Sequence, residues 1–254
     1  MTLNNYKLTR ILSEKFEGII WKIELNEKHG LIAIESRDTE LRKTAFSVIN
    51  YNTGEILFKQ KTFEEPWNLN LAYIAEKTLI ITAYGQAESP ESKGIISIHI
   101  PDAKVLWEHY NLTLNWATND GLQVYDPRIN PRRHSWISNI KGDSIREPDH
   151  INTKTNNLLF PQLMGSFVIP DFILSEELIG ETSVLVFLDL TIISFHEKIL
   201  NNIHQRLLVY QEDSILLDEI LIRNIQKLQP ESFFIQNNNL FYIRNKSEIV
   251  SYLV

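Results

Sequence analysis

Two stretches with the same pattern decide the fold: NYNTGEILF at residues 50–58 and HIPDAKVLW at residues 99–107. They align without a gap, and each follows a short run rich in β-branched residues. Each stretch predicts a polar turn that leads into a strand ending in a large aromatic residue. Strands joined by tight turns and repeated at a fixed distance are typical of a β-propeller or another repeat architecture.

The pattern recurs along the chain when each copy is anchored on its second apolar run. The intervals between the five anchors are 48, 43, 70 and 48 residues. Three of these intervals fit a four-stranded propeller blade of about 40–50 residues. We therefore expect the anchors to be central strands with buried side chains. Their apolar members are Leu31, Ile32, Ile34, Leu79, Ile81, Leu122, Val124, Ile193, Phe195, Leu240 and Tyr242.

These observations predict an all-β protein, a single β-propeller domain over residues 1–254 with five four-stranded blades. The long interval contains residues 149–172, read as an insertion or an irregular strand pair; a sixth, degenerate blade is the alternative. The last unit is one strand short, and an apolar-polar alternation at 6–12 supplies a strand that closes the ring and hides a sheet edge. The predicted units span 19–62, 66–110, 113–148, 173–222 and 226–254 with 6–12.

The turn and strand at residues 52–58 resemble the repeat of quinoprotein-like and WD-type β-propellers, in which an Asp/Asn-x-x-Thr-Gly-Lys turn precedes an apolar strand ending in Trp. Phe58 and Trp107 occupy that aromatic position. Over most of its length the chain also resembles an uncharacterised bacterial family of propeller-type proteins of unknown function, which implies a fold without an activity.

Quinone-dependent dehydrogenases resemble one another in having about eight blades and, in many, a vicinal cysteine pair. A chain of 254 residues without cysteine fits neither, so we expect no cofactor.

Composition excludes several functional classes. Hydrophobic residues make up 43% and charged residues 22% of the chain, which argues against wholesale disorder. The net charge of −7 argues against a nucleic-acid partner. The absence of cysteine removes disulfides and thiolate metal sites and fits a reducing compartment. The N-terminus lacks a signal-peptide pattern, and the most apolar stretch, 184–195, is shorter than the ~20 residues of a membrane span. We expect a soluble, cytoplasmic protein without a membrane partner.

No local motif indicates catalysis or metal binding. The seven histidines form no His-x-x-x-His or His-x-His pair, so we predict no metal site. Nucleophile elbows and phosphate-binding glycine loops are absent as well. The adjacent carboxylates Glu64-Glu65 and Glu176-Glu177 would point to opposite faces of a strand, so they cannot share a proton. A site built across blades would leave no such motif, so catalytic residues are unknown from the sequence.

One candidate binding site is a column of cations at corresponding positions of the repeat. The position six residues beyond the start of each anchor is basic in four of the five units. In a propeller these positions lie near the channel mouth, where Arg and Lys would bind a carboxylate or phosphate. The competing interpretation is that strand ends facing water are commonly basic. The four cations are Arg37, Arg128, Lys198 and Lys246.

A second candidate is the loop YDPRINPRRHSW at residues 125–136. Loops stiffened by proline that carry arginine and aromatic side chains are common at interaction hot spots. The competing interpretation is a solvated connection. We expect Asp126, Arg128, Arg132 and His134 to join the ligand-binding set.

Two functions from different classes fit the sequence. The first is a non-catalytic binding or scaffold propeller that uses its loop-bearing face for a protein partner or an anionic small molecule. The second is a small-molecule enzyme, a hydrolase or lyase, with its site in the mouth of the central channel. We favour the first because no nucleophile, base or metal cluster is visible in the sequence. A fold alone does not decide between them.

Overall fold

The computed structural model describes residues 8–64, 66–84, 92–148, 157–230 and 232–254. In these residues every regular element is a β-strand, apart from two short 3-10 helices, η1 (Glu27–His29) and η2 (Pro66–Asn68). The chain divides into two compact units. One is Phe16–Asn156, and the other combines Met1–Lys15 with Asn157–Val254.

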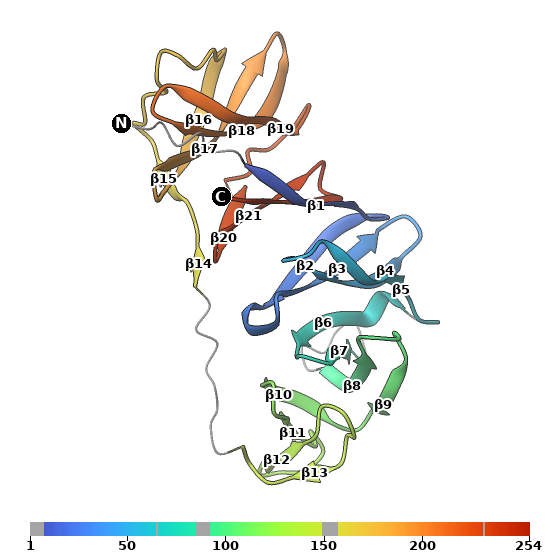
Figure 1. Ribbon diagram of the computed structural model, residues 1–254. Coiled ribbons are helices and arrows are strands. Elements are labelled where there is room, and N and C mark those ends of the chain that lie inside the picture. Colours follow the sequence, from blue (N-terminus) through green and yellow to red (C-terminus); the bar gives the residue numbers. More distant parts are fainter. Residues whose placement is uncertain (1–7, 65, 85–91, 149–156, 231) are drawn as a thin grey trace. The chain divides into compact units, whose positions relative to one another are not determined.

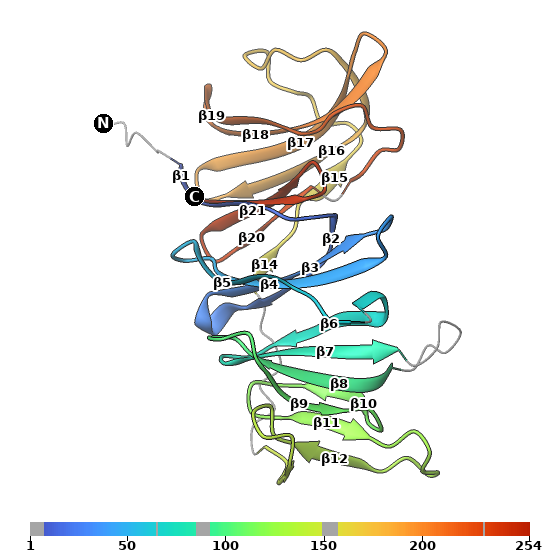
Figure 2. The same cartoon turned by 90° about the vertical axis from the view of Figure 1, so that its right-hand side faces the viewer.

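The unit Phe16–Asn156 contains three antiparallel sheets, each made of four strands in chain order (Figure 1). Figure 2 shows the three sheets following one another along the chain. The strands of the first sheet are β2 (Ile19–Asn26), β3 (Leu31–Asp38), β4 (Lys43–Asn50) and β5 (Glu55–Lys61). Those of the second are β6 (Leu69–Ile74), β7 (Thr78–Tyr84), β8 (Ser92–His99) and β9 (Val105–His109). Those of the third are β10 (Thr113–Ala117), β11 (Leu122–Tyr125), β12 (His134–Ile137) and β13 (Ser144–Ile145).

The two matching stretches form the same hairpin, the turn between the third and fourth strands of their sheets. In the first, Thr53 Oγ1 accepts the backbone N–H of Glu55 at 3.2 Å. In the second, Oδ1 of Asp102, the residue aligned with Thr53, accepts the N–H of Lys104 at 3.3 Å. The next residue has a positive φ in both turns, 76° at Gly54 and 55° at Ala103. Thr and Asp side chains stabilise such turns by replacing backbone hydrogen bonds, so the polar residue at this repeated position has a common structural cause.

The middle sheet of this unit is apolar on both faces. Leu79 and Ile81 of β7 pack in one cluster with β3 and β4 of the first sheet. Ile80, between them in sequence, packs in another cluster with Leu122 and Val124 of the third sheet. This alternation explains why the anchor is a continuous apolar run, since a strand buried on both faces needs one. Full burial of each such side chain contributes about 1.5–3 kcal/mol.

The second unit contains two five-stranded antiparallel sheets. In order across the sheet, one consists of β15 (Gln162–Met164), β16 (Glu177–Phe187), β17 (Leu190–Ile199), β18 (Asn202–Gln211) and β19 (Ser214–Ile222). The other consists of β1 (Thr9–Lys15), β22 (Glu248–Leu253), β21 (Asn239–Arg244), β20 (Phe233–Gln236) and β14 (Leu158–Leu159). The two sheets share an apolar cluster that includes Ile192, Leu221 and Leu240.

The predicted fold class is confirmed: the described chain is all-β, and its five sheets are consistent with five propeller blades. Each anchor is an interior strand: the second strand in the three four-stranded sheets (β3, β7 and β11) and the central strand in the two five-stranded sheets (β17 and β21). All eleven of the predicted apolar anchor residues are buried. Residues 213–227 contain the strand β19 and no helix. That one domain spans the whole chain stays a prediction.

The N-terminal strand completes the last sheet, as predicted. β1 pairs antiparallel with β22, with Thr9 opposite Leu253 and Lys15 opposite Glu248. Residues 6 and 7 of the predicted strand lie outside the described residues, as do 149–156 of the long interval. In the described part of that interval, β14 joins β20 and β15 joins β16. The two short strands therefore extend two existing sheets rather than form a sixth.

Candidate functional site

The predicted site residues share one topological position. We define the loop end of a sheet as the end at which its anchor strand finishes; the anchor strands are β3, β7, β11, β17 and β21. Arg37 lies near the finish of β3 and Lys198 near that of β17, while Lys246 is in the turn after β21. Asp126, Arg128, Arg132 and His134 lie between β11 and the start of β12. Each residue is thus at the loop end of its own sheet.

Tyr125 organises the loop between β11 and β12, residues 126–133. Its ring is buried, and the Arg132 guanidinium carbon lies 4.8 Å from the ring centroid. The His134 ring contacts the same ring edge-on, at 5.6 Å and 82°. A cation over an aromatic face is attracted by the ring quadrupole, so Tyr125 holds Arg132 in a defined orientation. The structure therefore brings two of the predicted residues together on one ring.

Asp126 and Arg128 form a second element of the same loop. The carboxylate accepts Arg128 Nε at 2.9 Å and Nη2 at 2.6 Å, and it also accepts the Arg128 backbone N–H at 3.0 Å. These hydrogen bonds lower the pKa of Asp126 to about 2, and the same pairing raises the pKa of Arg128. Arg128 remains 72% exposed. A ligand for Arg128 must therefore share the guanidinium with Asp126.

The loop is locally basic in an acidic chain. Asp126 is its one acidic residue, against Arg128, Arg132 and Arg133, whereas the whole chain carries −7. Arg133 is exposed and makes no hydrogen bond or ion pair with any residue that the structure describes. Arginine binds carboxylate and phosphate groups in a bidentate way. Binding of such a group by this loop stays a prediction.

Arg37 occupies a different environment, between the first and second sheets. Its Nε donates to Glu35 at 2.6 Å, and its Nη2 donates to Asn70 Oδ1 at 2.7 Å. Its guanidinium also lies 4.9 Å from the centroid of Trp21 and 5.5 Å from that of Trp67. These contacts lie in the first two sheets and give Arg37 a structural role. Its part in ligand binding stays a prediction.

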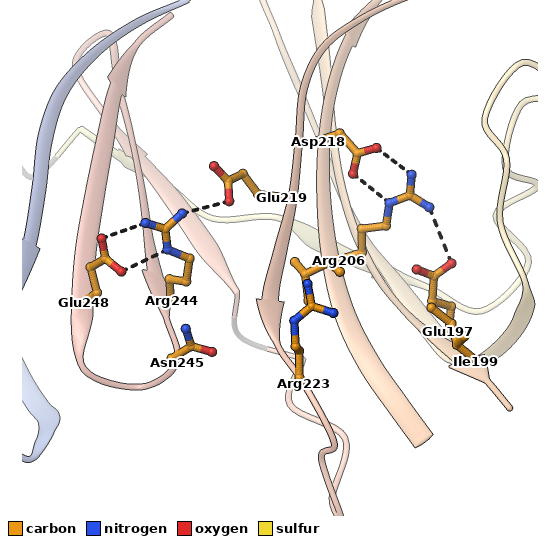
Figure 3. Close-up of a pocket in the computed structure, with 10 residues that line it drawn as sticks. Glu197, Ile199, Arg206, Asp218, Glu219, Arg223, Arg244, Asn245 and Glu248 are labelled. Carbon is orange, nitrogen blue, oxygen red and sulfur yellow. Dashed lines mark hydrogen bonds and ion pairs between the residues drawn. The ribbon is translucent and has the colours of Figure 1, made fainter. Parts of the chain in front are cut away.

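In the second unit, Lys198 and Lys246 lie next to a pocket rather than in its lining. Lys198 pairs with Glu177 at 3.6 Å. Lys246 is exposed and follows Asn245 in a turn where both residues have positive φ, 61° and 52°, as tight hairpin turns require. Their immediate neighbours Ile199 and Asn245 line the pocket, which has a volume of about 810 Å³ (Figure 3). The lining also includes Glu197, Arg206, Asp218, Glu219, Ile220, Arg223, Arg244 and Glu248.

Two arginine-centred networks border this pocket. Arg206 donates from Nε and Nη2 to Asp218 at 2.8 and 2.6 Å, and its Nη1 lies 3.5 Å from Glu197. Arg244 donates from Nε and Nη2 to Glu248 at 2.9 and 2.8 Å, and from Nη1 to Glu219 at 3.0 Å. Each pairing raises the pKa of its arginine. Hydrogen bonding by Arg244 also lowers the pKa of Glu248.

Sequence reasoning missed these networks for a geometric reason. Asp218 is not directly opposite Arg206, which pairs in register with Ile220. The contact between Arg244 and Glu219 joins two different sheets. One signal was available: Arg244 and Glu248 flank the three-residue turn 245–247 and are cross-strand partners. That signal identifies a pair but gives no indication of a pocket.

His196 fixes the segment that follows β19 onto the sheet. The buried His196 Nε2 accepts the backbone N–H of Gln229 at 3.3 Å, and Gln205 donates to the carbonyl of Gln229 at 2.7 Å. Burial lowers the pKa of His196, and a protonated Nε2 could not accept this hydrogen bond.

We therefore expect His196 to make stability depend on pH. The unfolded chain takes up the histidine proton below its ordinary pKa of about 6.5, whereas the folded chain takes it up only at lower pH. The contribution is complete above that value and is lost as the pH falls through the lowered pKa. Urea unfolding at about pH 7.5 and about pH 5.5, on either side of the ordinary value, should show a smaller loss for His196→Gln than for the wild type. Equal losses in the two proteins would contradict this role.

Across the described ranges, His, Asp and Glu side chains form no group of three or more that could hold a metal ion. In the same residues, no helix has the length and apolar character needed to cross a membrane.

Comparison with known proteins gives a partial family match and distant structural likenesses. Residues 25–107 match the model of a domain of unknown function (DUF4905). No curated protein matches the sequence.

Several solved structures resemble the chain at low identity. BamB from Moraxella catarrhalis has 9% identity and a TM-score of 0.34, with 93% of this chain and 85% of that chain covered. The β-propeller domain of the Trilobed protease from Pyrococcus furiosus has 11% identity and a TM-score of 0.31, with 92% and 69% covered. The β-propeller domain of Cps50 (Swd1) from Myceliophteria thermophila has 8% identity and a TM-score of 0.34, with 97% and 99% covered. At these TM-scores the fold assignment rests on the chain's own sheets.

Proposed function

We propose that this protein is a non-catalytic binding protein, and that it recognises anionic groups through the loop at residues 126–133 with His134. The recognised groups are carboxylates or phosphates, presented by a small molecule or by the acidic surface of a protein partner. The proposal places binding on a loop supported by a rigid sheet, which is where binding residues most often lie.

The observation that carries the proposal is the double contact on Tyr125. The buried ring holds Arg132 at 4.8 Å and His134 at 5.6 Å, so neither side chain has to be ordered by the ligand. Preorganised side chains strengthen binding because their conformational entropy is already lost. Arg133 adds an exposed cation beside them. The result is a basic, oriented surface on a chain with a net charge of −7.

Arg132→Ala is expected to weaken binding of an oligoglutamate peptide by about 10- to 150-fold. This range corresponds to about 1.5–3 kcal/mol for a hydrogen bond to a charged group. Arg128→Ala should weaken it in the same direction. Both variants should leave the melting temperature nearly unchanged, since the two side chains are exposed at the surface. Isothermal titration calorimetry with the peptide, and with inorganic phosphate, measures the effect.

Two further variants make this test specific. Lys141→Ala removes a positive charge from an exposed turn at the other end of the same sheet, so it should bind as the wild type does. Asp126→Asn removes the carboxylate that shares Arg128, so it should bind more tightly. If Lys141→Ala and Arg132→Ala lose the same affinity for the peptide, then net charge alone explains the loss, which would contradict a defined site.

A further inference from the structure

Arg223 differs from the other two arginines of the pocket in Figure 3. It follows β19, is exposed, and its guanidinium makes no hydrogen bond or ion pair with any described residue. Arg206 uses four N–H contacts and Arg244 uses three, all to acceptors of this chain. Arg223 therefore offers all five of its donors to a ligand.

The acidic side chains of the pocket differ in how many of their carboxylate oxygens already accept hydrogen bonds. Asp218 and Glu248 each place both carboxylate oxygens on one arginine. Glu219, by contrast, accepts from Arg244 through Oε2 alone. Glu197 is buried, and its Oε2 accepts both the N–H of Glu176 at 3.3 Å and Arg206 Nη1 at 3.5 Å. The Oε1 atoms of Glu219 and Glu197 have no hydrogen-bond partner among the described residues, so they remain as acceptors for a donor supplied by a ligand.

The charges of the lining define what such a ligand must carry. The pocket is lined by four carboxylates and three guanidinium groups, a net charge of −1. The bidentate pairs of Arg206 with Asp218 and of Arg244 with Glu248 cancel. What remains is one cation, Arg223, and two carboxylates, Glu197 and Glu219. A simple anion meets an overall negative site, and a simple cation leaves Arg223 without a partner.

We infer that this pocket binds a small zwitterion, an amino acid whose carboxylate pairs with Arg223 and whose ammonium group pairs with Glu219 or Glu197. Its volume of about 810 Å³ falls within the range of about 300–1,000 Å³ of small-molecule sites. A carboxylate pairs strongly with a guanidinium group because two parallel, charge-assisted hydrogen bonds form between them. This inference is independent of the loop at residues 126–133.

The test is a titration of the full chain with L-alanine and L-lysine, and separately with acetate and methylammonium. We expect saturable binding of at least one amino acid, and binding of acetate and of methylammonium at least tenfold weaker. Either of two results overturns the inference: neither amino acid binds, or acetate binds as tightly as the amino acids do.

Variants of the same loop identify the residue responsible. Arg223→Gln should weaken amino-acid binding at least tenfold without changing the melting temperature, because the side chain has no partner in the described residues. Lys227→Gln is the matched control: it removes an exposed cation four residues away that does not line the pocket. Unchanged amino-acid binding by Arg223→Gln overturns the inference. Phosphate binding by Arg223→Gln should stay at the wild-type level, which separates this site from the proposed anion-binding loop.

Discussion

Glu35→Ala is expected to lower the free energy of unfolding of the unit Phe16–Asn156 by about 3–5 kcal/mol, the range for breaking a buried ion pair. The Glu35 side chain is 0% exposed and that of Arg37 is 12% exposed. Glu35 accepts Arg37 Nε at 2.6 Å through one oxygen and the backbone N–H of Leu71 at 2.6 Å through the other. Removing the carboxylate leaves Arg37 Nε and the backbone N–H of Leu71 without their acceptor, and it leaves the Arg37 charge without its carboxylate partner.

Urea unfolding of four variants tests this expectation: Glu35→Ala, Arg37→Met, the double variant and a control. Glu40→Ala is the matched control, because Glu40 is exposed in the turn after β3, and it should stay within about 0.5 kcal/mol of the wild type. Glu35→Ala with Arg37→Met should be less destabilising than the sum of the two single changes, since the double variant leaves no unpaired charge. A loss below about 1 kcal/mol for Glu35→Ala, smaller than a typical core substitution, would show that the pair does not hold the two sheets together.

The strand order was predictable because its causes are local. Apolar runs such as Leu79-Ile80-Ile81 need a strand buried on both faces, and the turn residues Asn52 and Gly54 fix where one strand ends and the next begins. Both signals lie within a few residues of each other in the sequence, and turn chemistry sets hairpin register. The missing strand of the last sheet was predictable for another reason. The C-terminal unit lacks one strand and would leave a sheet edge unpaired, while the apolar-polar alternation at residues 6–12 belongs to no other unit and can pair with that edge.

The partners of charged residues were not predictable in the same way. Arg37 is placed at the correct end of β3 by the repeat, but the sequence gives no sign that its guanidinium contacts the rings of Trp21 and Trp67. Arg206 and Asp218 are twelve positions apart on neighbouring strands, and their side chains meet diagonally, since Arg206 lies opposite Ile220, two residues from Asp218. Such contacts depend on side-chain direction and on the distance between sheets, which no local pattern encodes. A repeat therefore predicts at which end of a sheet the charged side chains lie. Packing between strands and sheets determines which of these side chains form ion pairs within the protein.

Deleting residues 1–15 is expected to have the largest effect on the second unit, because it removes β1 from the last sheet. The loss includes the backbone pairing with β22, the buried side chain of Leu12 and the hydrogen bond from Ser13 to Glu248 at 2.7 Å. Hydrogen bonds of about 0.5–1.5 kcal/mol each and about 1.5–3 kcal/mol for Leu12 sum to more than about 5 kcal/mol, comparable with the stability of a whole domain. The bare β22 edge should also recruit strands from other copies, so we expect a lower melting temperature and association on size-exclusion chromatography with light scattering.

Deletion of residues 1–7 is the control, since it leaves β1 in place and should behave as the wild type. A 1–15 deletion that stays monomeric and melts with the wild type would mean that β22 is stable as an edge strand, and that β1 is not needed to complete the sheet.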